Sequence, residues 1–214
     1  MPPSPVNTLS ATPRRALRRH FRAQRRDLSD NDQREHARAA TRHALASGLF
    51  WGARTVAIYL PGDGELSPLP LAMQLTKQRV TITLPVVTES PGRGPHLLFR
   101  RWRPGDRLIP NRYGIPEPKT SAPLVNLLRH DRLVVPLVAF DDAGSRLGMG
   151  AGFYDRTLSA LPPQLRPNLI GYAHGLQKSA HALPRAEWDI PLDSVVTETG
   201  ITLFRSNGTR TMVV

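Results

Sequence analysis

Three apolar runs of strand type, with a helical stretch between the first two, constrain the fold of this chain most. Arg54–Leu60 and Arg79–Val87 have the sequences RTVAIYL and RVTITLPVV, and RLVVPLVAF at Arg132–Phe140 is the strongest candidate for a central strand. The pattern predicts a helix at Leu66–Gln78, because its prolines fall in the first turn. Alternating strands and helices indicate one α/β domain with three layers, a largely parallel sheet flanked by helices. Pro136 lacks an amide hydrogen, so we expect it at an edge or an irregularity.

Shorter elements complete the predicted domain. Two basic helices should pack on the sheet, one at about Arg14–Asp27 and one that follows Ser29 and reaches Ala46. A further helix should begin near Phe153 and reach Leu161. A long loop contains PNRYGIPEP at Pro110–Pro118. The other predicted strands are His96–Trp102, Leu169–Ala173, Ser194–Thr197 and Ile201–Phe204.

The two ends of the chain differ from the predicted domain, which we place at residues 14–205. Residues 1–13 are uncharged and rich in Pro, Ser and Thr, so we expect a disordered tail, and residues 206–214 form a short C-terminal tail. Arg14–Arg26 contains seven arginines and no acidic residue, which is also typical of a transit peptide. We prefer a helix docked on the domain, because apolar residues recur there at helical spacing. Whether the tail is cleaved stays open.

The composition narrows the classes of partner. The net charge is +12, and all but three of the 29 basic residues are arginine, which favours nucleic acid or small ligands with phosphates or several carboxylates. A genome-wide preference for arginine explains the charge equally well. Cysteine is absent, which excludes disulfides and thiolate metal sites, and the seven histidines show no HxxxH or HExxH spacing that predicts zinc. No apolar run is long enough to span a membrane. We expect a cytoplasmic monomer.

The segment Arg146–Asp155, RLGMGAGFYD, carries the clearest chemical signal. Its three alternating glycines leave backbone N–H groups unobstructed between a strand and a helix, which is suited to phosphate oxygens. Arg146 could add a cationic contact, and Asp155 could hold the Mg²⁺ of a nucleoside triphosphate. The spacing matches neither a Walker loop nor the dinucleotide fingerprint. A tight turn with positive φ angles is the alternative.

Several motifs, in their order along the chain, resemble the 5-formyltetrahydrofolate cyclo-ligase family, also called methenyltetrahydrofolate synthetase. The central strand, acidic turn and glycine segment form PLVAFDDAGSRLGMGAGFYDR at Pro136–Arg156. YLPGDGE lies at Tyr59–Glu65, FRRWRPGDRLIPNRYGIPEP at Phe99–Pro118, and WDIPLDSVVTE at Trp188–Glu198. The resemblance covers roughly Arg14–Thr202.

This resemblance implies a reaction and a set of site residues. It implies cyclisation of 5-formyltetrahydrofolate to 5,10-methenyltetrahydrofolate with ATP and Mg²⁺, through an N5-iminium phosphate and with release of ADP and phosphate. The residues implied in catalysis are Arg146, Tyr154 and Asp155, and those implied in Mg²⁺ binding are Asp155 and Asp193. The folate would contact Tyr59, Glu65, Trp102, Glu117 and Tyr154. ATP would be held by Arg14, Arg18, Arg146, Gly148, Met149, Gly150, Ala151, Gly152, Phe153 and Tyr154.

The sequence departs from the family pattern at several positions within these motifs. Arg14 stands where lysine is usual, Ser67-Pro68 replaces an Asp-Thr pair, and Met149 and Ala151 separate the glycines. A side chain at Ala151 is tolerated only if its φ stays negative.

Two other functions are alternatives to the cyclo-ligase reaction. They are an arginine-rich RNA-binding protein and another phosphate-binding α/β enzyme, of the sugar-phosphate isomerase or CoA-transferase kind. If the folate is polyglutamylated, its anionic tail would be attracted by the excess of arginine.

Overall fold

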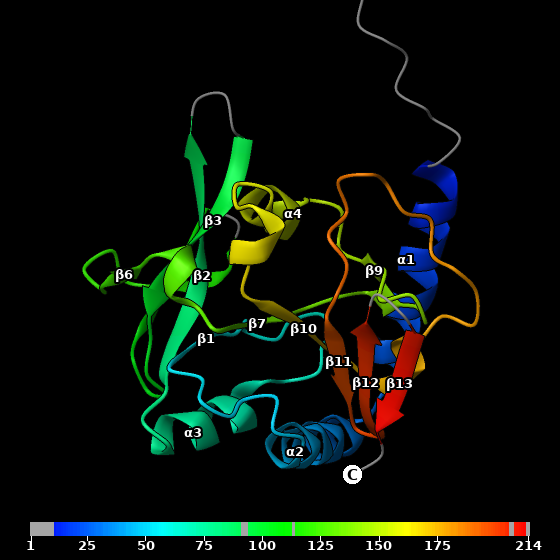
Figure 1. Cartoon of the computed structure of the whole chain (residues 1–214), viewed down its shortest axis with the longest axis horizontal. Coiled ribbons are helices and arrows are strands. Elements are labelled where there is room, and N and C mark those ends of the chain that lie inside the picture. Colours follow the sequence, from blue (N-terminus) through cyan, green and yellow to red (C-terminus); the bar gives the residue numbers. More distant parts are fainter. Residues whose placement is uncertain (1–10, 91–93, 113, 206–207, 213–214) are drawn as a thin grey trace, which may run out of the picture.

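A nine-stranded sheet forms the middle of the molecule (Figure 1). The computed structural model describes residues 11–90, 94–112, 114–205 and 208–212. The five central strands, in the order β11-β10-β7-β1-β2, pair in parallel, and antiparallel strands extend both edges. The strands are β1 Thr55–Ala57, β2 Thr81–Ser90, β3 Gly94–Arg101, β6 Leu124–Val125, β7 Arg132–Val135, β10 Asn168–Tyr172, β11 Ser194–Thr197, β12 Gly200–Arg205 and β13 Gly208–Met212.

Helices cover both faces of the sheet, as the predicted α/β class requires. Helices α2 (Asp30–Ala46) and α3 (Leu69–Lys77) lie on one face, and the short α4 (Phe153–Leu158) lies on the other (Figure 1). Side chains of the central strands alternate between two cores, because successive residues of a strand point to opposite faces. Val134 packs in the core under α2 and α3, whereas its neighbours Leu133 and Val135 pack in the core under α4.

The N-terminal helix α1 (Ala11–Arg26) docks on the chain, as its apolar spacing predicts. Leu17 and Phe21 pack against a small core that includes Val138 and Leu147. Helix α2 then begins at the predicted N-cap, Ser29, whose hydroxyl accepts a hydrogen bond of 3.1 Å from the amide of Asp32. Helix α1 begins at Ala11, so it includes three residues of the predicted disordered tail.

The segment Arg132–Phe140 does not form the single strand that we predicted, but the predicted irregularity at Pro136 is confirmed. β7 ends at Val135, immediately before Pro136. The chain resumes as β8 (Ala139–Phe140), which pairs with β9 (Arg146–Leu147) outside the main sheet. Pro136 cannot donate to a ladder, so the parallel pairing stops there and the chain turns toward the glycine segment.

Three further boundaries differ from the sequence prediction. The helix expected to reach Leu161 ends at Leu158, and Pro162 disfavours helical backbone at Leu161, which excludes that residue from the helix. The predicted loop around PNRYGIPEP contains a small hairpin of β4 (Leu108–Pro110) and β5 (Pro116–Pro118). β13 lies within the predicted C-terminal tail and pairs with β12, where it satisfies backbone groups of that strand.

Candidate functional site

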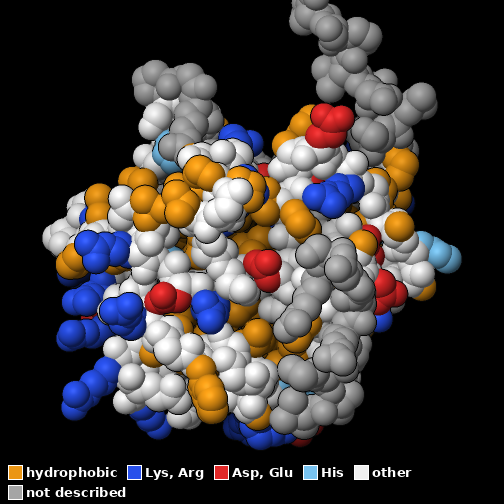
Figure 2. Space-filling view, in the orientation of Figure 1, with side chains coloured by type: hydrophobic (Ala, Val, Ile, Leu, Met, Phe, Trp, Pro, Cys, Tyr) orange, Lys and Arg blue, Asp and Glu red, His pale blue; other side chains and the backbone are white. Residues whose placement is uncertain are grey.

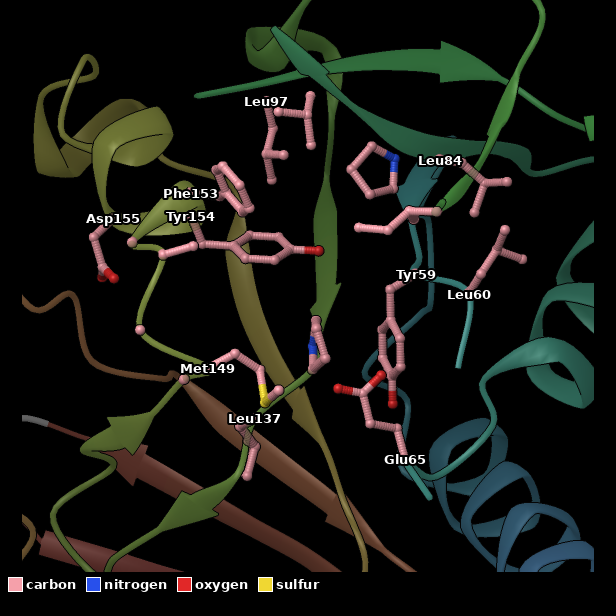
Figure 3. Close-up of a pocket in the computed structure, with 18 of the residues that line it drawn as sticks. Tyr59, Leu60, Glu65, Leu84, Leu97, Leu137, Met149, Phe153, Tyr154 and Asp155 are labelled. Atoms are coloured by element: carbon pink, nitrogen blue, oxygen red, sulfur yellow. The ribbon is translucent and has the colours of Figure 1, made fainter. Parts of the chain in front are cut away.

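A cavity of about 370 Å³ lies beside the carboxyl end of the parallel strands (Figure 3). The glycine segment and the start of α4, from Gly148 to Asp155, form one wall. Tyr59 and Glu65, which follow β1, lie on the wall opposite Tyr154. Apolar side chains close the remaining sides, among them Leu84, Val87, Leu97, Ile115 and Pro116. Loops after parallel strands meet at this edge of a sheet, which is where α/β proteins bind ligands.

The glycine segment has the backbone that its sequence requires. Gly150 and Gly152 have φ angles of 108° and 66°, and Gly152 caps α4. Ala151 lies between them without a positive φ, so this departure from the family pattern carries no backbone strain. Gly148 faces open space, with no atom within 4 Å of where a side chain would begin.

Tyr154 and Glu65 are two of the polar residues that line the cavity, and they approach it from opposite walls (Figure 3). Burial and the nearby Glu65 carboxylate raise the pKa of the Tyr154 hydroxyl, so it stays protonated at neutral pH and can donate a hydrogen bond. Burial also raises the pKa of Glu65, while the guanidinium of Arg25 acts in the opposite direction. Glu65 Oε1 lies 3.5 Å from Arg25 Nη2, and the amide of Gly62 donates to its Oε2 at 3.2 Å.

Arg25 and Asp63 support Glu65, a role that the sequence pattern did not predict for either residue. The Arg25 side chain is completely buried and donates hydrogen bonds to Asp63 Oδ2 at 2.8 Å and to the carbonyl of Leu137 at 3.0 Å. Arg22 and Arg26 also pair with the Asp63 carboxylate. Burial opposes ionisation of Asp63, but these three arginines outweigh it and hold its pKa well below the usual value. Two features of the sequence could have indicated this ion-pair cluster: the Asp within YLPGDGE and the basic N-terminal helix.

A second, smaller pocket of about 200 Å³ lies on the other side of the glycine segment. Its lining combines the three alternating glycines with four arginines, Arg14, Arg18, Arg146 and Arg156. Arg18 Nε donates to the carbonyl of Gly148 at 2.8 Å, which ties α1 to the segment. Arg14 pairs with Asp189 and donates to the carbonyl of Pro184 at 2.8 Å. The structure therefore brings Arg14 and Arg18 to the glycines, as predicted, and adds Arg156.

Asp155 lines both pockets, whereas Asp193 lines neither. Asp155 Oδ1 accepts hydrogen bonds from Arg146 Nη2 at 2.6 Å and from the amide of Ile190 at 3.1 Å. Asp193 Oδ2 instead accepts from the amide of Leu169 at 2.7 Å, at the start of β10. Burial raises the pKa of Asp193, which fits a carboxyl that anchors a strand. Of the two predicted Mg²⁺ ligands, the structure therefore places Asp155 in the lining of the pockets and Asp193 outside it.

Trp102 and Glu117 were both predicted to face the folate, and the structure separates them. Trp102 is 6% exposed within the core under α3, and its amide donates to the carbonyl of Ile82 near the start of β2. Because β3 runs antiparallel to β2, Trp102 emerges at the end of the sheet away from the cavity, and it is not among the residues that line the cavity. Glu117 does line the cavity, with Oε1 bonded to the amide of Val87 at 2.9 Å and to Asn111 Nδ2 at 2.7 Å.

Comparison with known proteins finds relatives over nearly the whole chain. The model of the 5-formyltetrahydrofolate cyclo-ligase family matches residues 10–198. The 5-formyltetrahydrofolate cyclo-ligase of Escherichia coli (strain K12) is 42% identical over 178 residues, which cover 83% of this chain and 96% of that protein. The enzyme of the same name from Haemophilus influenzae is 36% identical over 190 residues, covering 86% and 96%.

Comparison of the fold with solved structures identifies relatives of the same kind as the sequence comparison does. The NMR structure of Aquifex aeolicus 5,10-methenyltetrahydrofolate synthetase superposes with a TM-score of 0.76 at 30% identity, and covers 94% of this chain and 96% of that one. A Mycoplasma pneumoniae 5,10-methenyltetrahydrofolate synthetase has a TM-score of 0.68 at 22% identity, which supports the fold. No helix in the described part of the chain is long and apolar enough to cross a bilayer. The glycine segment, the two pockets beside it and these relatives lead to one conclusion: the chain belongs to the 5-formyltetrahydrofolate cyclo-ligase family.

Proposed function

We propose that this chain converts 5-formyltetrahydrofolate to 5,10-methenyltetrahydrofolate in a reaction driven by ATP and Mg²⁺. Family membership supports the reaction. One structural observation supports its assignment to this site: an apolar cavity and an arginine-rich pocket share the segment Gly148–Asp155. Two substrates that exchange a phosphoryl group must lie side by side, and these pockets lie on either side of one backbone.

The larger cavity suits the folate. Its lining is mainly apolar, with Leu84, Leu97 and Phe153 available to contact flat aromatic rings. Glu65 and Tyr154 add a buried carboxyl and a protonated hydroxyl at fixed positions. An apolar slot with a few converging polar groups is the usual design of a small-molecule site.

The smaller pocket suits the phosphates of ATP. Four arginines line it, and Asp155 and Asp189 are the acidic residues in its lining. Gly148 and Gly150 have no side chain, so backbone and guanidinium groups can approach phosphate oxygens there. A side chain at Gly150 would begin 3.4 Å from Arg18 Cζ and would occupy the space beside this guanidinium. Phosphoryl transfer depends on positioning and charge neutralisation, which arginines and backbone donors supply.

The proposed chemistry proceeds in two steps. The formyl oxygen on N5 attacks the γ-phosphorus of ATP, so an O–P bond forms, the bond to ADP breaks, and an N5-iminium phosphate results. N10 then attacks the formyl carbon and loses its proton, and the C–O bond breaks to release phosphate. Both steps need the folate held against the glycine segment, which Glu65 and Tyr154 are positioned to do.

Asp155 fits a role in Mg²⁺ binding. Within the described residues its Oδ2 has no hydrogen-bond partner, while Oδ1 is bonded to Arg146 and to the amide of Ile190. One carboxylate oxygen beside bound phosphates is a typical Mg²⁺ environment, because this ion keeps several of its waters. When bound, Mg²⁺ would neutralise phosphate charge.

Two finer features of the proposal concern the substrate and the state of the protein. Lys and Arg side chains gather along the left edge of the face in Figure 2, on the β6 side of the sheet, and the net charge is +12. We include polyglutamylated folate among the substrates, and affinity for it should weaken as salt rises. The monomeric state and the cytoplasmic location stay predictions.

One assay tests the proposal against its rivals. Purified protein is incubated with 5-formyltetrahydrofolate and Mg²⁺, with and without ATP, and formation of the methenyl chromophore is followed by absorbance. We expect product only when ATP is present. A folded protein that gives none would overturn the proposal, and binding to RNA or to sugar phosphates in parallel titrations would then identify which rival is correct.

A further inference from the structure

Two histidines and a glutamate from distant parts of the chain converge outside both pockets. His36 lies on α2, His174 follows β10, and Glu198 lies between β11 and β12. His36 Nδ1 lies 2.9 Å from His174 Nδ1 and 3.9 Å from Glu198 Oε2, and one potential ligand atom of each residue lies within 4.8 Å of the others. None of the three lines the folate cavity or the arginine-rich pocket.

We propose that His36, His174 and Glu198 form a binding site for one Zn²⁺ ion. Tetrahedral zinc with ligand bonds of about 2.0–2.2 Å holds its ligand atoms about 3.4 Å apart. Two of the observed separations, 2.9 and 3.9 Å, lie on either side of that value, and all three ligand atoms lie within 4.8 Å of one another, so side-chain rotations would complete the geometry. Two imidazoles and a carboxylate suit zinc with water as the fourth ligand, whereas Mg²⁺ and Ca²⁺ prefer oxygen alone.

His174 is held in position by the fold. The residue is fully buried, and its backbone amide donates to Gln177 Oε1 at 2.9 Å. Its Nδ1 lies 2.9 Å from His36 Nδ1, and its Nε2 has no hydrogen-bond partner within the described residues. The Nδ1 atoms of His174 and His36 face each other, so the fold already places two imidazole nitrogens where one ion could bind both.

Glu198 is oriented by a close contact with the backbone of Gly175. The amide of Gly175 donates to its two carboxylate oxygens at 3.0 and 2.8 Å. A side chain at Gly175 would begin 2.8 Å from Glu198 Oε1, so any other residue would displace the carboxylate. His43, seven residues beyond His36 on α2, bonds to the carbonyl of Glu198 at 3.1 Å. Such contacts fix the direction of a metal ligand.

The site is reachable from solvent and would join two layers of the fold. The side chains of His36 and Glu198 are 25% and 15% exposed, which leaves an entry path for the ion. Zinc at this point would tie α2 to the ends of β10 and β11. Because the unfolded chain lacks the preformed site, binding would raise the melting temperature.

The test uses the full chain, freed of metal with a chelator and kept in Mg²⁺ buffer. Zn²⁺ titration by calorimetry should give one equivalent, zinc should raise the melting temperature, and Co²⁺ should give a tetrahedral absorption spectrum. His36→Gln changes a partly exposed ligand and should weaken zinc binding by about 100-fold or more. Glu198→Gln should weaken it as well and abolish the cobalt spectrum.

The matched control is His181→Gln, which removes an exposed histidine outside the cluster. It should bind zinc like the unmodified chain. Absence of stoichiometric binding would overturn the proposal, and so would an equal loss of affinity in His36→Gln and His181→Gln. Neither readout depends on cyclo-ligase activity, so the site and the proposed reaction can fail separately.

Discussion

Arg146 Nη2 donates a hydrogen bond of 2.6 Å to Asp155 Oδ1, and both residues line both pockets. The Arg146 side chain is 6% exposed, so this ion pair is largely shielded from water. A guanidinium and a carboxylate in contact neutralise each other. Bound phosphates and Mg²⁺ would give each of them a new partner of opposite charge.

Asp155→Asn should lower turnover by at least about 100-fold and weaken binding of Mg²⁺–nucleotide, because charge neutralisation dominates phosphoryl transfer. The fold should persist, since an amide fills the same space. Steady-state kinetics and a melting curve check both parts. Asp142→Asn, at a carboxyl 69% exposed and paired with Lys178, is the control and should behave normally. Near-normal activity of Asp155→Asn would remove this residue from the metal site.

Glu65→Gln should raise the KM for 5-formyltetrahydrofolate by about tenfold, the size expected for loss of a charged hydrogen bond, and change the KM for ATP less. The residue lies on the wall of the cavity opposite Tyr154 and away from the arginine-rich pocket. Glu35→Gln, on an exposed part of α2, serves as the control. A larger effect on ATP than on folate would mean that the two subsites are reversed.

Gly148→Ala should leave the melting temperature unchanged and still raise the KM for ATP by about tenfold. A methyl group there meets no protein atom within 4 Å, and the backbone φ is not positive, so only a ligand can collide with it. Gly152→Ala makes the contrast: its φ is 66° and the methyl would lie 2.9 Å from Arg156 Nη1. That variant should lose about 1 kcal/mol of stability as well as activity. If Gly148→Ala bound ATP normally, phosphates would not occupy this space.

Asp63→Asn should destabilise the protein by about 3 kcal/mol, because Arg25 is completely buried and loses the nearer of its two charged partners. Three arginines hold the pKa of Asp63 well below its usual value. Its stabilising effect is therefore full above the unfolded pKa of about 3.9 and is lost as pH falls toward the folded pKa. Urea unfolding of both proteins at several pH values measures this. The difference between them should shrink below pH of about 4, and a constant difference would contradict the ion-pair account.

Trp102→Phe should leave both KM values unchanged, since the side chain lies in the core under α3. The indole nitrogen has no hydrogen-bond partner in the described part of the chain, so phenylalanine loses only volume. We expect destabilisation of about 1 kcal/mol in urea unfolding. A raised folate KM with an unchanged unfolding curve would return Trp102 to the substrate site.

Sequence patterns predicted a feature correctly where the residues that define this feature lie in one segment of the chain. The alternation of strands and helices predicted the α/β class, because side-chain period and layer packing are linked directly. Ser29, three residues before Asp32, predicted the start of α2 correctly. The glycine segment, together with Arg14 and Arg18, indicated the arginine-rich pocket, although Arg156 was not predicted to line it.

Tertiary structure decided everything that depends on which end of the sheet a residue reaches. Trp102 and Asp193 lie in segments that resemble the family, yet strand direction places Trp102 in the core and Asp193 just before β11, beside the start of β10. Arg25 and Glu65 become partners only when α1 docks beside the loop after β1. Likewise, no spacing along the chain indicates that His36, His174 and Glu198 meet. The sequence by itself determined the class of fold, the glycine segment and the family, because these are local; the pairing of distant side chains required strand order and direction, which periodicity does not encode.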